Sequence, residues 1–474
     1  MSETTENSLE SSLQRLKCHF TWNLLGEKSL DEFESIVLYK NEFQNCGFKA
    51  TMFNVLAYIK HRRGQNEAAL QCLKQAEEII KQEHPSQAKI RSLVTWGNYA
   101  WIYYHMDQLE DAQTYVDKVK QVCAEFFNPY RMESPELHAE EGWARLKCTI
   151  KQLERAKVCF EEALEKKPKN PEFTSGWAIA SSRLNNWPPS QHPINPLREA
   201  IRLNPDNQYI KVLLALKLEK VKLEDGEDEG ERLVEEALKE APDATDVLGS
   251  AAKYYHNKKV WHKAITQLGK ALEHRPQNPY LHYYLGNCYR SQVLQMLEKK
   301  ENKTYAEREK LLRQTELALK HLEEASESNV NFFCISSFIA ILYAIVGQYN
   351  NADAYEKAEY YFQKEFSKEL TPVAKQKLHL RYGNFQLCNM KCVTKATQHF
   401  IEGVKINVES KKREKMKDKL QKIAQSQLSK NEANSEALDL LAFLQELNGE
   451  MQQADKDLKR NLDSGNLIPA ASLD

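Results

Sequence analysis

The sequence has few residues that break helices and no long apolar run. Glycine and proline number only 16 and 15 in 474 residues, which is too few for a collagen-like, low-complexity or loop-rich chain. No run of roughly 18 apolar residues occurs, so we expect no membrane-spanning helix. The first residues are polar and acidic and lack the basic and apolar regions of a signal peptide, so we expect a cytoplasmic protein.

Signatures of catalysis and of metal binding are also missing. The ten cysteines are scattered without a C-x-x-C pair, which predicts reduced thiols in a cytosolic core. The 13 histidines show no metal-ligand spacing. No phosphate-binding loop, dinucleotide fingerprint, zinc-protease helix or nucleophile elbow occurs. We therefore expect a protein that is not an enzyme and that holds no metal and no cofactor.

Charge of neither sign is in excess. Lys plus Arg number 66 and Asp plus Glu number 67, a net charge of −1. This balance excludes a uniformly basic surface, such as that of a histone. It leaves open that cations gather on one inner surface while acids collect elsewhere.

What the chain does contain is a repeating helical pattern. A small residue recurs 12 positions before an alanine. The pairs are Ala57/Ala69, Ala100/Ala112, Ala144/Ala156, Ala252/Ala264, Ala340/Ala352 and Ala442/Ala454. In the copies beginning at Ala156 and Ala264, a bulky residue follows at +4, an alanine at +7 and a proline at +12. This pattern is typical of tetratricopeptide repeats, in which small residues let two antiparallel helices cross closely.

The repeat predicts an all-α fold, a tetratricopeptide-repeat superhelix of about nine helix-turn-helix units with extra helices. We expect loops at Trp187–Pro196 and at the acidic run Glu224–Glu231, and a charged helical extension over residues 291–317. Four parts are expected: N-terminal helices at 1–45, N-terminal repeats at 46–170, linking repeats at 171–245, and C-terminal repeats with a basic helix at 246–474.

Ligands of such a solenoid bind its concave face, which the first helix of each unit lines. With the small residue of that helix as position 8, positions 2, 5, 9, 12 and 13 point inward. The basic and aromatic residues at these positions are Tyr58, His61, Arg62, Trp101, Tyr104, His105, Arg145, Arg183, Lys253, His256, Tyr283, Arg290, Arg381 and Phe385. The inward acids are Glu141, Glu219 and Asp246. Cations for phosphates and rings for stacking favour single-stranded nucleic acid, and an acidic peptide is the alternative ligand.

A second basic feature lies near the C-terminus. From Lys405 to Lys422 there are eight cations against three acids, a local charge of +5. The cations are Lys405, Lys411, Lys412, Arg413, Lys415, Lys417, Lys419 and Lys422. A solvated helix with ion pairs four residues apart explains this run as well as RNA binding does. In the RNA-binding interpretation the helix closes the C-terminal end of the groove.

Several segments resemble one known family over nearly the whole chain. They are Leu16–Leu24, Ser92–Trp101, Glu140–Trp143, Leu203–Tyr209 and His379–Gln386. The family is that of the interferon-induced proteins with tetratricopeptide repeats. The resemblance implies a cytosolic antiviral protein that binds RNA in a basic channel, self-associates and pairs with other family members. It is strongest to the branch that binds AU-rich RNA, single- or double-stranded, rather than 5′ ends.

The resemblance also implies site residues. The family's RNA-channel cations match Arg183, Lys253, Arg290 and Lys405, and the inward register selects the first three independently. The register adds Arg62 and Arg381 to the predicted RNA-binding residues. The chain departs from the family at His256 and Asn257, where two cations are typical, and at Ser35–Val37, which has none.

Two other functions stay open. Ile341, Ala344 and Ile345 occupy inward positions but are apolar, so they either pack in the core or dock a partner helix or a second copy. The second case would make the chain a non-catalytic interaction scaffold that forms dimers and complexes with family members. Some relatives stack an aromatic residue on a 5′ end, and Trp143, at the matching position, either packs or contacts such a ligand.

Overall fold

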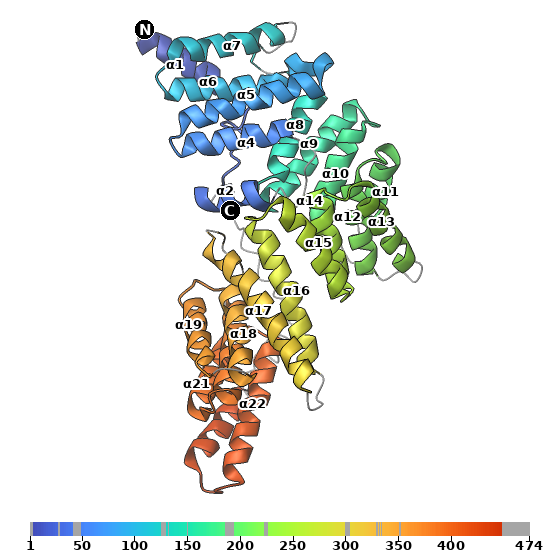
Figure 1. The fold of residues 1–474 in the computed structure, drawn as a ribbon. Coiled ribbons are helices and arrows are strands. Elements are labelled where there is room, and N and C mark those ends of the chain that lie inside the picture. Colours follow the sequence, from blue (N-terminus) through green and yellow to red (C-terminus); the bar gives the residue numbers. More distant parts are fainter. Residues whose placement is uncertain are drawn as a thin grey trace, which may run out of the picture. The chain divides into compact units, whose positions relative to one another are not determined.

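Helices make up the regular structure of the chain (Figure 1). The computed structural model describes residues 3–26, 29–40, 49–124, 129–130, 132–148, 150–184, 194–221, 226–298, 304–328, 330, 332, 334–349 and 352–447. No strand occurs in these ranges, and none of their helices is long and apolar enough to cross a membrane. The predicted all-α fold is confirmed.

The chain forms two compact units. The N-terminal unit comprises residues 1–299 and 320–331, and the C-terminal unit comprises residues 300–319 and 332–474. The finer division into four parts stays a prediction.

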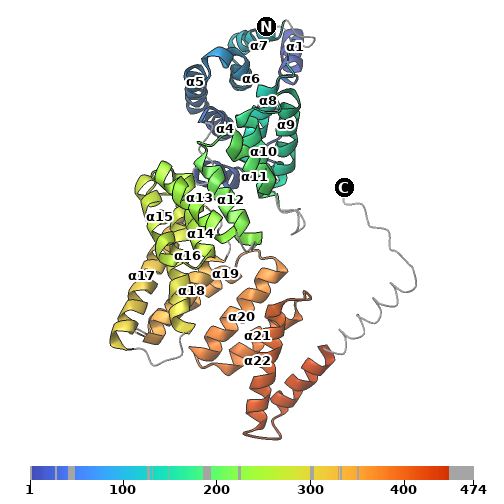
Figure 2. The ribbon, with the colours of Figure 1, turned by 90° about the vertical axis from the view of Figure 1, so that its right-hand side faces the viewer.

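In the N-terminal unit, helices follow one another as pairs (Figures 1 and 2). The pairs are α4 (Lys49–Arg62) with α5 (Asn66–Glu83), α6 (Ala88–His105) with α7 (Leu109–Cys123), α8 (Pro135–Leu146) with α9 (Leu153–Lys166), α10 (Pro171–Arg183) with α11 (Ile194–Leu203), α12 (Gln208–Val221) with α13 (Gly226–Glu240), and α14 (Thr245–Asn257) with α15 (Trp261–His274). The next helix is α16 (Pro279–Glu298), and α17 (Tyr305–Glu327) is divided between the two units, with residues 305–319 in the C-terminal unit. First helices of successive pairs contact each other, from α4 and α6 to α12 and α14, so they share one face.

An N-terminal segment packs on the first pairs. It contains α1 (Glu3–Leu13), α2 (Leu30–Ser35) and a π-helical turn at Ile36–Lys40. The loop after α1 buries Cys18 and His19, and the His19 N–H donates to Asn98 Oδ1 at 3.1 Å. Gly97 permits this approach, because a Cβ there would lie 2.9 Å from the Cβ of Cys18. The loop thereby holds Phe20 beside α4 and α6.

The C-terminal unit continues the repeat. Its helices are α18 (Ile335–Tyr349), α19 (Ala354–Phe366), α20 (Pro372–Cys388), α21 (Val393–Lys405), α22 (Lys411–Leu428) and a helix at residues 435–447. In Figure 2, α20, α21 and α22 lie side by side, and α22 contacts both of the others. The described helices from α4 to α21 thus form nine successive helix-turn-helix units, as expected.

Most of the predicted crossing residues are buried, but two pairs are wrong. Ala352 is exposed in the turn before α19, whereas Ala358 is fully buried. The reason is that α18 runs on to Tyr349, so Gly347 meets Tyr355 and the close crossing moves along the chain. Ala442 is exposed on the helix at 435–447, and its partner Ala454 lies outside the described residues.

The two expected loops also need correction. Residues 226–231 of the acidic run are the first turns of α13, and residues 224 and 225 lie outside the described part. Arg198 and Lys263 pair with Glu229 at 2.8 Å and Glu231 at 2.9 Å. In the proline-rich stretch, residues 187–193 lie outside the described part, and Pro196 belongs to the first turn of α11. Proline is tolerated there because its missing N–H has no helical partner. Of the charged extension over 291–317, residues 291–298 are helical in α16 and residues 305–317 in α17, while residues 299–303 lie outside the described part.

Candidate nucleic-acid interface

Four cations gather on three neighbouring first helices of the N-terminal unit. Arg183 ends α10, Lys217 and Lys220 lie on α12, and Lys253 lies on α14. Burial and the charges of Lys220 and Lys253 lower the pKa of Lys217 from 10.5 to about 8. Burial, Lys220 and Arg183 likewise lower the pKa of Lys253. The four side chains, here called the cation cluster, are therefore close enough to repel one another.

No described carboxylate pairs with Lys217, Lys220 or Lys253. The nearby inward acids are engaged elsewhere: Glu219 accepts from Asn257 Nδ2 at 3.0 Å, and Asp246 is buried and accepts from the Val247 N–H at 2.9 Å. Lys253 is exposed to solvent, yet enough protein surrounds its ammonium to lower its pKa. That combination suits a residue that contacts an anionic ligand.

Arg183 and Arg290 flank these lysines and are held by neutral partners. Arg183 is half-buried and donates from Nη2 to Tyr209 Oη at 3.1 Å and from Nη1 to the Leu146 carbonyl at 3.3 Å. Arg290 on α16 donates from Nε to Asn287 Oδ1 at 3.2 Å. It lies near α14, because its charge adds to burial in lowering the pKa of His256. These hydrogen bonds orient both guanidinium groups.

A cluster of rings lies at the N-terminal pairs. Phe20 stacks on Trp101, with ring centroids 5.8 Å apart and planes 12° apart. His61 and His105 stack at 4.9 Å, with Nδ1 of His105 3.0 Å from Nε2 of His61. Arg62 is exposed beside them, and its charge adds to burial in lowering the pKa of both histidines. We call these five residues the ring cluster.

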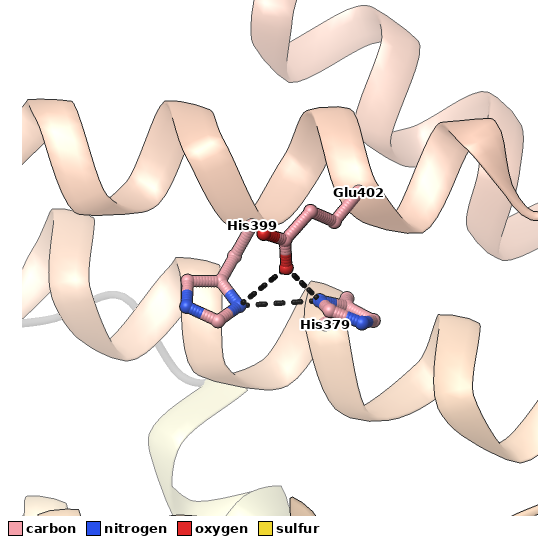
Figure 3. Close-up of side chains that lie close together, drawn as sticks. All are labelled: His379, His399 and Glu402. Carbon is pink, nitrogen blue, oxygen red and sulfur yellow. Dashed lines mark hydrogen bonds and ion pairs between the residues drawn. The ribbon is translucent and has the colours of Figure 1, made fainter.

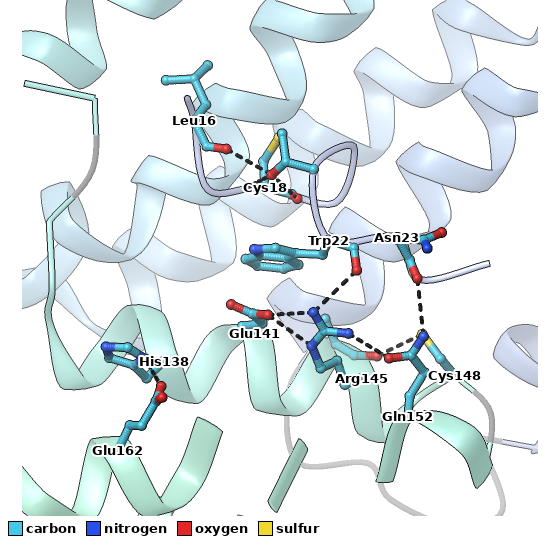
Figure 4. A network of polar contacts seen from close by, with 12 residues as sticks. Leu16, Cys18, Trp22, Asn23, His138, Glu141, Arg145, Cys148, Gln152 and Glu162 are labelled. Carbon is cyan, nitrogen blue, oxygen red and sulfur yellow. Dashed lines mark hydrogen bonds and ion pairs between the residues drawn. The ribbon is translucent and has the colours of Figure 1, made fainter. Parts of the chain in front are cut away.

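Two inward residues predicted from the register, Arg145 and Phe385, are instead structural, and so is Trp143, which the resemblance singled out. Arg145 is buried and donates from Nη2 to Glu141 Oε1 at 2.6 Å and to the Trp22 carbonyl at 3.2 Å (Figure 4). It thereby joins the N-terminal loop to α8. Trp143 is only 1% exposed and meets the Phe160 ring edge-on at 5.0 Å, so it packs in the core. Phe385 is also buried, at 3% exposure.

Two of the predicted cations belong to the C-terminal unit. The Arg381 Nη1 donates to Ser337 Oγ at 2.6 Å, and its guanidinium lies 4.8 Å from the Phe338 ring centre. Lys405 is exposed at the end of α21, 5.8 Å from the ring centre of Phe443, beside a cavity of about 510 Å³. Each offers a cation next to a ring.

The basic run on α22 divides into structural and exposed cations. Arg413 is buried, pairs with Glu409, and donates from Nε to the Val404 carbonyl at 2.9 Å. Lys417 is buried and pairs with Glu414 at 3.1 Å. Lys411, Lys415 and Lys422 are exposed. Pairs within the helix therefore account for part of the basic run, and the exposed lysines carry its remaining charge.

The structure thus brings together Arg183 and Lys253, with Arg290 near α14, and places Arg62 in the ring cluster. Sequence reasoning missed Lys217 and Lys220. Lys220 occupies inward position 13 when Ala215 is position 8, so the repeat register could have predicted it. Lys217 is not at an inward position, and only its neighbours in the structure identify it. The apolar residues Ala344 and Ile345 are each 6% exposed and Ile341 is partly buried, which fits core packing.

Comparisons with known proteins agree with this architecture. No family model matches the chain. The human protein named interferon-induced protein with tetratricopeptide repeats 2 is 66% identical over 100% of this chain and 99% of its own length. The mouse protein of that name is 56% identical over the same shares. The human antiviral innate immune response effector IFIT1 is 41% identical over 95% of this chain and 94% of its own length.

Solved structures of IFIT1 are similar in fold. A monomeric IFIT1 mutant solved with Gppp-AAAA has a TM-score of 0.76 and 40% identity, covering 97% of this chain and 100% of the other. A human IFIT1 dimer with m7Gppp-AAAA, at the same coverage, has a TM-score of 0.73 and 39% identity.

Proposed function

Because the chain belongs to the family of interferon-induced proteins with tetratricopeptide repeats, we propose that it is an interferon-induced antiviral protein that binds RNA. It holds the RNA on the face formed by its first helices, without catalysis, and restrains viral replication or translation. It acts in the cytoplasm, and its nine described cysteines, all free thiols, suit that reducing compartment.

The observation that carries the proposal is the cation cluster. Lys217, Lys220 and Lys253 repel one another without a described carboxylate between them. Backbone phosphates supply the missing negative charge, and binding them releases counterions. Arg183 presents a preoriented guanidinium to the same phosphates.

Further contacts extend the proposed RNA path. Arg290 lies beyond α14, and the ring cluster with Arg62 offers stacking surfaces toward the N-terminus. In the C-terminal unit, Arg381 and Lys405 offer phosphate contacts next to rings. The exposed lysines of α22 add to them.

We propose AU-rich RNA, single- or double-stranded, as the preferred ligand. The resemblance to the AU-binding branch supports this preference. Recognition of a capped or triphosphorylated 5′ end is the alternative. Trp143, the aromatic residue at the matching position, is buried against Phe160 and is therefore not exposed for stacking on a terminal base.

A charge reversal within one helix pair tests the RNA site. Lys253 lies on α14, and Lys270, also exposed, lies on the second helix α15. In filter binding with an AU-rich oligonucleotide, Lys253→Glu is expected to weaken binding at least about tenfold. That loss corresponds to the free energy of one charge-assisted hydrogen bond. Lys270→Glu should bind as the wild type does. Equal binding by the two variants would contradict the site.

The same assay separates the candidate ligands. A GC-rich oligonucleotide of equal length is expected to bind more weakly than the AU-rich one, and a 5′-hydroxyl end should suffice. A polyglutamate peptide is the competitor for the acidic-peptide alternative. If it displaces RNA at matched charge concentration, the groove is a peptide site instead.

We also propose that the chain forms homodimers and complexes with other family members. The solved IFIT1 structure described as a dimer supports this for a 39% identical relative. Light scattering at micromolar concentration is expected to give twice the 55.0 kDa chain mass. A strictly monomeric species would count against the interaction-scaffold function.

A further inference from the structure

Two histidines and one glutamate converge on a single point in the C-terminal unit (Figure 3). His379 projects from α20, while His399 and Glu402, three residues apart, project from one face of α21. The two Nδ1 atoms are 3.1 Å apart. Glu402 Oε2 lies 3.5 Å from His379 Nδ1 and 3.6 Å from His399 Nδ1.

The size of this triangle matches a metal coordination sphere. A point equidistant from the three atoms lies about 2.0 Å from each, the bond length of Zn²⁺ to imidazole nitrogen and close to its bond length to carboxylate oxygen. Two imidazoles and a carboxylate are also ligands that zinc prefers. We propose that His379, His399 and Glu402 bind a Zn²⁺ ion, which a water molecule or a small anion completes to four-coordination.

The packing around the three side chains suits such a site. Gly403 faces His379 closely, because a Cβ at Gly403 would lie 3.0 Å from the Cβ of His379. The rings of Phe366 and Tyr382 contact the two imidazoles and fix their planes. The helices are thus held close enough for ligands from both to reach one ion.

Exposure rises across the site from histidine to carboxylate. The side chain of His379 is 5% exposed, that of His399 21% and that of Glu402 45%. An ion can therefore enter from the carboxylate side, and its fourth ligand can come from solvent.

Two cations and one further carboxylate surround the ligands. Lys375 and Lys395 act on His379 and His399, and Glu359 acts on His399 in the opposite sense. A Zn²⁺ ion bound by one carboxylate keeps one positive charge, which Glu359 opposes. The ion would join α20 to α21.

Zinc titration of the full chain tests the site. Chain stripped with a chelator is titrated with ZnCl₂ by calorimetry against a competing chelator of known affinity. His399→Ala and Glu402→Gln are each expected to lose one strong site, a fall in affinity of at least about tenfold. His262→Ala, at an exposed histidine of α15, is the matched control and should keep it.

Cobalt substitution identifies the donors. The bound Co²⁺ is expected to show the intense visible absorption of tetrahedral nitrogen and oxygen coordination, without thiolate charge transfer. Cys388 is exposed and Cys392 half-buried in the same helix pair, so they are the competing ligands. A thiolate band, or unchanged zinc affinity in both folded ligand variants, would overturn the proposal.

Discussion

At the scale of single residues, structural cations differ from the proposed binding cations in having an acidic residue four positions earlier on the same helix. Arg145 follows Glu141 by four residues, and Arg413 follows Glu409 by four, and both guanidinium groups are buried in those pairs. Lys253, Arg183 and Lys220 have no acid at that spacing. The residues four positions before them are Gly249, Ile179 and Leu216, respectively. The spacing rule of helical ion pairs therefore sharpens the inward register, which alone does not distinguish Arg145 from Arg183.

Lys217 is expected to make RNA binding depend on pH. Its pKa in the free protein is about 8, and a nearby phosphate would raise it, because the anion favours the charged ammonium. Binding then takes up a proton, so affinity should fall as pH rises from 7 to 9.5. By linkage the fall approaches about tenfold per pH unit between the free and bound pKa values of this one group.

Lys217→Gln supplies the comparison. Its affinity should be lower at pH 7 and nearly independent of pH over the same range, as fluorescence anisotropy would show. Lys270→Gln should keep the wild-type profile. Parallel profiles for the wild type and Lys217→Gln would remove Lys217 from the interface.

At the scale of helices, close crossings fix the register of the repeat. The Phe160 ring on α9 fills the space left by Gly142 on α8 and Gly176 on α10. A Cβ at either glycine would overlap that ring. The positions that line the groove are set by this stacking, because each first helix is oriented by its second helix and by the next pair.

Gly176→Ala is expected to destabilise the N-terminal unit by about 1–3 kcal/mol, since the added methyl overpacks Phe160. Gly269→Ala on α15 is the matched control. No neighbouring atom lies within 4 Å of its Cβ position, so it should stabilise the helix by up to about 1 kcal/mol. Urea unfolding followed by circular dichroism measures both. Equal effects would contradict the packing.

Sequence periodicity predicted these helices well where the two partners lie 12 positions apart, as at Ala57 and Ala69. The periodicity failed to predict helix bounds and crossing positions where contacts between residues far apart in the sequence are involved. The first turns of α13 pair with Arg198 and Lys263, which belong to the helix pairs on either side of it. The longer α18 moves its crossing from Ala352 to Ala358. Neither cause is visible within the local pattern.

At the scale of the whole molecule, a net charge of −1 is compatible with a local cluster of cations, because acidic side chains form ion pairs elsewhere. Glu229 and Glu231 of the acidic run are paired in α13, while Lys217, Lys220 and Lys253 have no described carboxylate partner. The sequence predicted Arg183 and Lys253 as inward residues, and in the structure the charge of Arg183 acts on Lys253. It gave no sign of the His379, His399 and Glu402 site, since its two histidines stand 20 positions apart on different helices.

The salt dependence of RNA affinity tests the central claim most directly. For single-stranded RNA, log K should fall linearly with log salt, by about 0.7 per phosphate contacted. The double variant Lys220→Gln, Lys253→Gln is expected to bind more weakly and to reduce the slope by about 1.4, because two phosphate contacts are lost. If the folded double variant shows the wild-type slope and affinity, the cation cluster is not where RNA binds.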